Sequence, residues 1–300
     1  MDMTQDKCCR HGANLRRRRR RRRKILRSII FSCSIIAVAV FVAVGSRMIR
    51  SGDGRTNRYD VEAGNNTYDN AVIENSKISE KNKIQNNQSM LDDIMNSTQY
   101  PKQLKDLALK NEEALEFVYD YPAEHVKEHT IDLTEEASID SVPLFVQWDK
   151  RWGYEKYSGN FFAASGCGPT TLSMVVVYLT HNREASPIAV AKYSKEAGYS
   201  VDGSGSSWTL ISEGCMHYGV KAKTVALDES RMKAELDAGH PIVVNVGPGD
   251  FTDTGHFMVI TGYDDEGFSI NDPNSIEKSG KRWLFKNISS QIRAVWSMYV

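Results

Sequence analysis

Cysteine is scarce in this sequence: there are five in 300 residues, which is not an even set from which a disulfide framework could be built. Cys8, Cys9 and Cys33 belong to the N-terminal part, so only Cys167 and Cys215 fall in the region of globular composition. Internal repeats are absent, and so is the phosphate-binding pattern Gly-x4-Gly-Lys-Ser/Thr. These absences exclude a disulfide-stapled scaffold, a repeat protein and a P-loop nucleotide-binding domain.

Candidate metal ligands are also sparse. Cys215 and His217 are close in the sequence, but positions two apart on a helix point in different directions. The sequence offers no further ligands beside them to make up the three or four that a zinc site needs. We therefore predict no metal and no cofactor, and we interpret Cys215 as a core residue.

Net charge is absent as well, because 38 Lys+Arg balance 38 Asp+Glu. The balance hides an asymmetry, since residues 1–50 hold 14 of the basic residues and only 2 of the acidic ones. Arg16–Arg23 is an unbroken arginine run, and Ser28–Ser46 follows as 19 residues without a charge. Roughly 20 apolar residues span a bilayer, and basic flanks stay cytoplasmic. The pattern predicts a basic cytoplasmic tail (1–27) and a transmembrane helix (28–48), with the rest of the chain extracellular.

Two alternatives compete with this single-pass anchor in the cell membrane. The arginine run could bind nucleic acid, but its position beside an apolar span favours anchoring, so we expect no nucleic-acid partner. The apolar segment could be a cleaved signal peptide, because Val42–Gly45 contains small residues. The apolar part of a signal peptide usually has about 7–15 residues, however, and this one is longer.

The residues after the anchor fall into two stretches. Residues 49–99 are polar, rich in Asn and poor in aromatics, which predicts a disordered stalk. Residues 100–140 are a helical lead-in followed by an acidic linker. Apolar side chains at helical spacing predict two short helices over 101–119, with a break near Lys110–Asn111. Their apolar faces need a partner, which we expect to be the domain that follows.

Residues 141–300 have the aromatics, glycines and short apolar runs of one compact domain. Its patterns predict helices at 169–181, 187–197, 207–218 and 230–238, and strands at 222–226, 241–246, 256–263, 267–271 and 294–299. Because helices come first and strands later, we predict an α+β fold with a mainly antiparallel sheet.

A thiol stands directly before the first of these helices, in Gly166-Cys167-Gly168-Pro169-Thr170. Pro169 suits the first turn of a helix. Unpaired N–H groups and the positive end of the helix dipole would favour the thiolate of Cys167, which is the nucleophilic form. The flanking glycines would let a substrate backbone approach the sulfur. The alternative is a buried structural cysteine.

Two further residues strengthen the interpretation of Cys167 as a nucleophile. His256 opens the strand expected at 256–263, and Asp272 follows the next strand directly. If those strands are antiparallel neighbours, the two side chains lie side by side at one end of the sheet. Cys, His and Asp in this order allow the base to activate the thiol and the acid to fix the imidazole tautomer.

A fourth motif, Val142-Pro143-Leu144-Phe145-Val146-Gln147-Trp148-Asp149-Lys150-Arg151-Trp152-Gly153, precedes the cysteine by about twenty residues. Together with Gly255-His256-Phe257 and Asn271-Asp272-Pro273, these motifs resemble a papain-like cysteine peptidase. More narrowly, they resemble the double-glycine (bacteriocin-processing) leader peptidases, in a membrane-anchored, stand-alone form from Gram-positive bacteria. The resemblance covers roughly 100–300 and is strongest over 142–273.

The resemblance implies a papain-like fold, in which the helix that carries the cysteine packs on an antiparallel sheet. It implies that Cys167 is the nucleophile, His256 the general base and Asp272 the acid that orients the base. It also implies that the side-chain amide of Gln147 forms the oxyanion hole with the backbone N–H of Cys167. A neutral donor there could stabilise an oxyanion without quenching the thiolate.

The exporter-linked relatives of this family cleave leaders inside the cell, whereas this domain is expected to face outward, so their substrates do not carry over. The leading hypothesis is a surface-anchored thiol peptidase that acts on a peptide or protein. Amide chemistry on cell-wall peptides, as in NlpC-type hydrolases, and transglutaminase-like acyl transfer use the same groups. A binding module without turnover is the remaining alternative, although a binder needs none of these four residues.

Overall fold

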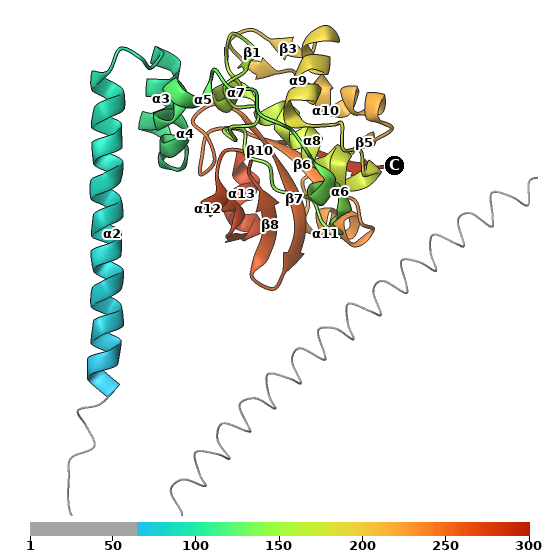
Figure 1. Cartoon of the computed structure of the whole chain (residues 1–300). Coiled ribbons are helices and arrows are strands. Elements are labelled where there is room, and N and C mark those ends of the chain that lie inside the picture. Colours follow the sequence, from blue (N-terminus) through green and yellow to red (C-terminus); the bar gives the residue numbers. More distant parts are fainter. Residues whose placement is uncertain (1–64) are drawn as a thin grey trace, which may run out of the picture. The chain divides into compact units, whose positions relative to one another are not determined.

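The computed structural model describes residues 65–300, with side chains from residue 79 onward (Figure 1). The predicted tail (1–27), transmembrane helix (28–48) and first part of the stalk lie outside the described residues. The lead-in and the domain predicted at 141–300 belong to one compact unit, Ile73–Val300. Between residues 65 and 300, every helix is too short or too polar to cross a bilayer.

Helix α2 spans Asn65–Asn96, so the expectation of a disordered stalk over 49–99 is wrong for these residues. The stretch contains neither Gly nor Pro, the two residues that most disfavour a helix interior. Its C-terminal turns also find a partner, because Ile94 is fully buried and Met90 and Leu91 pack beside it against the lead-in. Tertiary packing therefore supports a helix that composition alone did not indicate.

The lead-in is helical, with the break where the sequence predicts it. Helix α3 (Lys102–Lys110) ends at Asn111, whose side chain accepts a hydrogen bond from Glu113 N and so caps the short helix η1 (Glu112–Ala114). The chain continues through α4 (Leu115–Tyr119), α5 (Tyr121–Glu124) and, in the linker, α6 (Thr134–Ser138). Leu104, Leu107, Phe117 and Val118 share a core with Phe161 and Ala163, so the lead-in packs on the domain after it.

The main sheet has six antiparallel strands in the order β5-β10-β6-β7-β8-β9. Five of them fall where the patterns predict strands: β5 (Lys221–Thr224), β6 (Ile242–Val246), β7 (His256–Asp264), β8 (Gly267–Asn271) and β10 (Ile292–Tyr299). The sequence did not predict β9 (Arg282–Trp283), nor the two small hairpins β1 (Lys156–Tyr157) with β2 (Asn160–Phe161) and β3 (Ser200–Val201) with β4 (Gly205–Ser206). Strands of two residues are too short to show a period.

The helices around the sheet largely follow the predicted pattern. Helices α8 (Cys167–Thr180), α9 (Pro187–Glu196) and α11 (Glu229–Asp237) were predicted, whereas α7 (Phe162–Ser165), α12 (Ile276–Ser279), α13 (Phe285–Ile288) and η3 (Ser289–Gln291) were not. The helix expected at 207–218 is two pieces, α10 (Thr209–Ser212) and η2 (Gly214–Tyr218). The pieces meet at Glu213, whose backbone angles are not helical, and at Gly214, a weak helix former.

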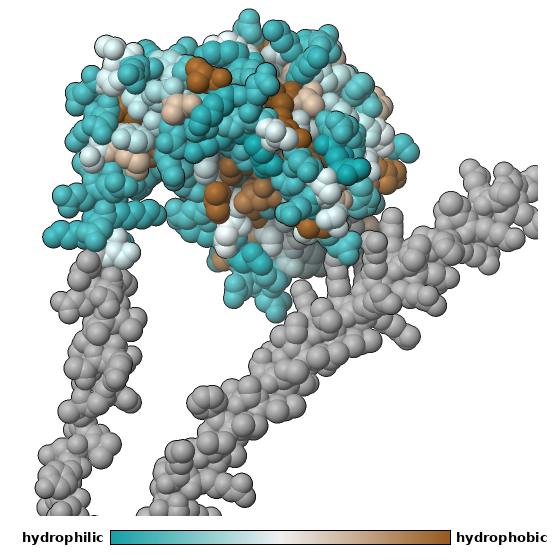
Figure 2. All heavy atoms as spheres, in the orientation of Figure 1, coloured by the Kyte–Doolittle hydropathy of each residue, from teal (hydrophilic) through white to brown (hydrophobic). Residues whose placement is uncertain are grey.

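Alternating side chains along the sheet build a core on each face. Val243 and Val259 face one core with α8, whereas Val244 and Met258 face a second core with Met232 of α11. Helix α8 has apolar residues on all sides and is buried over most of its length, which fixes it firmly against β7. The mixed helix-and-sheet fold is thus confirmed. Figure 2 shows one face of the molecule, on which hydrophilic residues predominate and hydrophobic residues form small groups.

Candidate active site

Cys167 is the first residue of α8, two positions before the predicted start of the helix. The carbonyl of Gly166 accepts hydrogen bonds from both the N–H (3.0 Å) and the hydroxyl (2.8 Å) of Thr170, which closes the first turn. Pro169 lies within this turn, where a missing N–H costs no hydrogen bond. The sulfur of Cys167 therefore sits beside unpaired N–H groups at the positive end of a buried 14-residue helix. It is partly exposed, unlike the fully buried Cys215.

The two glycines beside Cys167 do not have the role that we expected. A Cβ atom on Gly168 would lie 2.5 Å from the Oγ of Ser206, and one on Gly166 would lie 2.6 Å from the ring of Phe162. Both distances are shorter than real Cβ contacts allow. The space beside each glycine is thus filled by the chain itself, and the glycines let β4 and α7 approach the start of α8.

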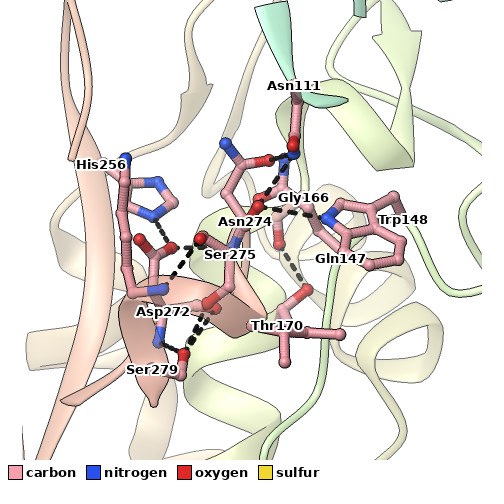
Figure 3. A network of polar contacts seen from close by, with 12 residues as sticks. Asn111, Gln147, Trp148, Gly166, Thr170, His256, Asp272, Asn274, Ser275 and Ser279 are labelled. Atoms are coloured by element: carbon pink, nitrogen blue, oxygen red, sulfur yellow. Dashed lines mark hydrogen bonds and ion pairs between the residues drawn. The ribbon is translucent and has the colours of Figure 1, made fainter. Parts of the chain in front are cut away.

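His256 and Asp272 meet at one end of the sheet. His256 opens β7, Asp272 follows β8 directly, and these strands are antiparallel neighbours. His256 Nε2 lies 2.7 Å from Asp272 Oδ1, and the side chains are 7% and 0% exposed (Figure 3). Asp272 Oδ1 also accepts a hydrogen bond of 2.8 Å from Asn274 N, so the carboxylate is held from two sides.

The electrostatics link Cys167 to this pair. Burial raises the pKa of the Cys167 thiol, but the His256 imidazole and nearby backbone N–H groups outweigh it, so the net pKa lies below the usual 9.0. Burial lowers the pKa of His256, but the Asp272 carboxylate and the Cys167 thiolate outweigh it and raise that pKa to about 10. The lowered thiol pKa and the raised imidazole pKa together favour a thiolate–imidazolium pair. At Cys215 burial has the largest effect on the thiol, and it raises the pKa of this group to about 11.

Gln147 is buried next to the same loop. Its Nε2 donates a hydrogen bond of 2.7 Å to the carbonyl of Ala163, and its backbone N donates one of 2.7 Å to the carbonyl of Pro273. Its Oε1 is buried without a hydrogen-bond partner among the described residues. An amide nitrogen carries two hydrogens, so one N–H of Gln147 remains available after the bond to Ala163.

The sequence did not indicate the polar network around Asp272. Trp148 Nε1 and Asn111 Nδ2 both donate to the carbonyl of Asn274, at 3.2 and 2.9 Å (Figure 3). Ser279 Oγ accepts a hydrogen bond of 2.9 Å from the backbone N–H of Asp272. Asn111 is 163 positions from Asn274, so no local pattern could have paired the two.

The model of the Peptidase_C39-like family matches residues 139–300. Among solved structures, the chain is similar to the peptidase domain of Streptococcus ComA, a bifunctional ABC transporter involved in a quorum-sensing pathway. That match has 20% identity and a TM-score of 0.37, and it covers 45% of this chain and 90% of that one. The chain is also similar to a putative C39-like peptidase from Bacillus anthracis, with 17% identity and a TM-score of 0.33. This match covers 53% of this chain and 95% of that one. No curated protein gives a significant match.

Proposed function

Since the chain belongs to the Peptidase_C39-like family, we propose that it is a surface-anchored cysteine peptidase in which Cys167, His256, Asp272 and Gln147 perform the catalysis. The supporting observation is the buried contact between His256 and Asp272, together with a depressed thiol pKa for Cys167 at the start of a helix. These are the properties that a thiol nucleophile needs near neutral pH.

In the proposed reaction, the Cys167 thiolate attacks the carbonyl carbon of the scissile peptide bond. The oxyanion that forms accepts hydrogen bonds from the Cys167 N–H and from the free N–H of the Gln147 amide. His256, as the imidazolium, gives its proton to the leaving amine, and a thioester remains on Cys167. Water then attacks the thioester while His256 takes up its proton. The sulfur leaves as the thiolate, which releases the acid product and restores the thiolate–imidazolium pair. Asp272 holds the imidazole in place throughout.

The anchoring part of the proposal rests on sequence alone. Arg16–Arg23 followed by the uncharged run Ser28–Ser46 would place the tail in the cytoplasm and residues after Met48 outside the cell. The substrate would then be an extracellular peptide or protein, or the peptide part of the cell wall.

A thiol-directed peptide probe, such as a peptidyl epoxide, tests the proposal on the full chain purified in detergent. Covalent modification at Cys167 that is lost in His256→Ala would support an enzyme. Absence of modification in the wild-type chain would favour the binding module.

Peptide and muropeptide libraries, offered separately to the same preparation, then distinguish the enzyme classes. Cleavage of peptides alone supports the peptidase, whereas cleavage of muropeptides alone would support a cell-wall hydrolase. Transfer to an added amine in place of hydrolysis would support an acyl transferase.

A further inference from the structure

The residues after Asp272 form a loop that reaches several parts of the proposed active site. Asp272 contacts His256, and the carbonyl of Pro273 accepts a hydrogen bond from the backbone N–H of Gln147. The carbonyl of Asn274 accepts one from the indole of Trp148, the residue next to Gln147. The position of residues 272–276, which we call the acid loop, therefore affects both the orienting carboxylate and the oxyanion donor.

Two side chains of the lead-in hold the acid loop from outside the matched family region. Asn111 Nδ2 donates to both oxygens of Asn274, at 2.9 Å to the carbonyl and 3.1 Å to Oδ1. Glu113 Oε1 accepts a hydrogen bond from the hydroxyl of Ser275, and Oε2 accepts two from the backbone N–H groups of Ile276 (2.7 Å) and Glu277 (3.0 Å). The lead-in thus makes five hydrogen bonds to residues 274–277.

The bonds made by Glu113 are charge-assisted, and such bonds are stronger than neutral ones. They also satisfy N–H groups of the first turn of α12, which have no partner within the helix. The two anchoring residues are themselves coupled, because Asn111 Oδ1 accepts a hydrogen bond of 3.0 Å from Glu113 N. Losing the Asn111 side chain would therefore also loosen the backbone that carries Glu113.

The hydrogen bonds that Asn111 and Glu113 make to residues 274–277 lie at the edge of the solvent. They line an open, largely polar groove of about 970 Å³, whose other wall is formed by residues 83–93 of α2. Water can replace an ordinary surface hydrogen bond there at little cost. A carboxylate that receives three donors from residues 275–277 is harder to replace, and this explains how a partly exposed contact can hold the acid loop in one position.

We propose that Asn111 and Glu113 are positioning residues for the proposed peptidase, which keep the Asp272 carboxylate in contact with His256 by holding the acid loop. The proposal rests on the catalytic roles given above. It extends the active-site scaffold beyond the matched family region, to a segment that is continuous with α2. Docking of the lead-in is then a condition for activity, in addition to a contribution to stability.

The test measures how fast iodoacetamide alkylates Cys167 in the full chain, as a function of pH and with peptide-resolved mass spectrometry. The titratable groups that face His256 are Asp272 and Cys167. If the carboxylate moves away, the imidazolium is less stable and the thiolate form of Cys167 is lost with it. In Glu113→Ala we expect alkylation at pH 6 to slow by about tenfold, which corresponds to one pKa unit.

Two further variants separate positioning from general stability. Asn111→Asp has the same shape but lacks the donor to Asn274, and we expect it to slow alkylation in the same way. Glu116→Gln changes an exposed carboxylate on the same lead-in and should behave as the wild type. Thermal unfolding of each variant shows whether the chain is folded at the temperature of the assay. If Cys167 is alkylated at the wild-type rate in both Glu113→Ala and Asn111→Asp, the proposal is overturned.

A second readout keeps this proposal separate from the proposed function. If Cys167 of the wild type reacts no faster than Cys215, the peptidase proposal fails. The positioning proposal is then decided by the pKa of His256, measured by NMR with labelled histidine. That pKa should fall in Glu113→Ala relative to the wild type, and an equal pKa in both chains would overturn the role of Glu113.

Discussion

The imidazole Nε2 of His256 lies 2.7 Å from a carboxylate oxygen of Asp272, which has no exposed surface. This contact leaves Nδ1 as the ring nitrogen that can exchange a proton with a substrate or a thiol. The same oxygen accepts the backbone N–H of Asn274, whereas Oδ2 is buried without a partner among the described residues. A buried carboxylate with so few donors depends on the imidazolium for its stabilisation, so each charge supports the other.

Asp272→Asn should remove that support while keeping the shape of the side chain. The folded-state pKa of His256, about 10, lies above its usual 6.5, so protonated His256 stabilises the fold. This stabilisation is fully present below pH 6.5 and disappears as the pH rises through about 10. We therefore expect the wild type to exceed the variant in unfolding free energy by more than about 1 kcal/mol at pH 6, and the difference to shrink by pH 10. Urea unfolding at several pH values measures this, and a difference independent of pH would contradict it.

Cys167 should be alkylated well before Cys215. At pH 6.5 the imidazolium of His256 favours the thiolate of Cys167, whereas a pKa of about 11 leaves almost all of the Cys215 thiols protonated. We expect iodoacetamide to label Cys167 at least about a hundredfold faster, and His256→Ala to remove most of that advantage. Equal rates in urea provide the control. Equal rates in the folded chain would mean that Cys167 is not activated.

Gln147→Ala should lower the turnover number by about a hundredfold or more, if its amide donates to the oxyanion. The variant also leaves the buried carbonyl of Ala163 without this donor, which costs about 1–3 kcal/mol of stability, and the chain should remain folded. Alkylation of Cys167 should be nearly unchanged, because the amide carries no charge. Steady-state kinetics on a cleaved peptide measure the effect, and an unaltered turnover number would assign the oxyanion to another donor.

How much the sequence predicts depends on the range of the interactions. The strand that begins at His256 and the helix that begins near Cys167 follow from local periods and from glycine and proline positions. The meeting of His256 with Asp272 follows from one further step, because a short turn joins β7 and β8 as antiparallel neighbours. The break at Asn111 is a local signal too.

The remainder depends on contacts between distant residues. Nothing near Glu113 indicates that it binds the loop 162 positions later. The helicity of 65–96 depends partly on burial of Ile94 against the lead-in, which a polar composition conceals. The glycines beside Cys167 were misinterpreted for the same reason, because Ser206 and Phe162 fill their space from other parts of the chain.

The topology can be tested on intact cells. The arginine run before the apolar segment predicts that residues beyond Met48 are extracellular. External protease should therefore remove the folded domain while a tag before Arg16 stays protected. Lysed cells, in which both parts are accessible, are the control. Protection of residues 100–300 in intact cells would contradict the proposed orientation, and release of the domain without protease would indicate a cleaved signal peptide.

Gly168→Ala tests whether the glycine serves the packing of the chain. The added methyl group would meet the side chain of Ser206, which is held by a hydrogen bond of 2.6 Å to the hydroxyl of Tyr157. Relief requires β4 to move away from the start of α8, and overpacking of this kind typically costs about 1–3 kcal/mol. Gly262→Ala is the matched control, since a methyl group on Gly262 meets nothing within 4 Å. Urea unfolding should show the loss for Gly168→Ala and a change within about 0.5 kcal/mol for Gly262→Ala.

Recovery of stability in the double variant Gly168→Ala with Ser206→Gly would identify Ser206 as the residue that the methyl group displaces, whereas an undiminished loss would exclude it.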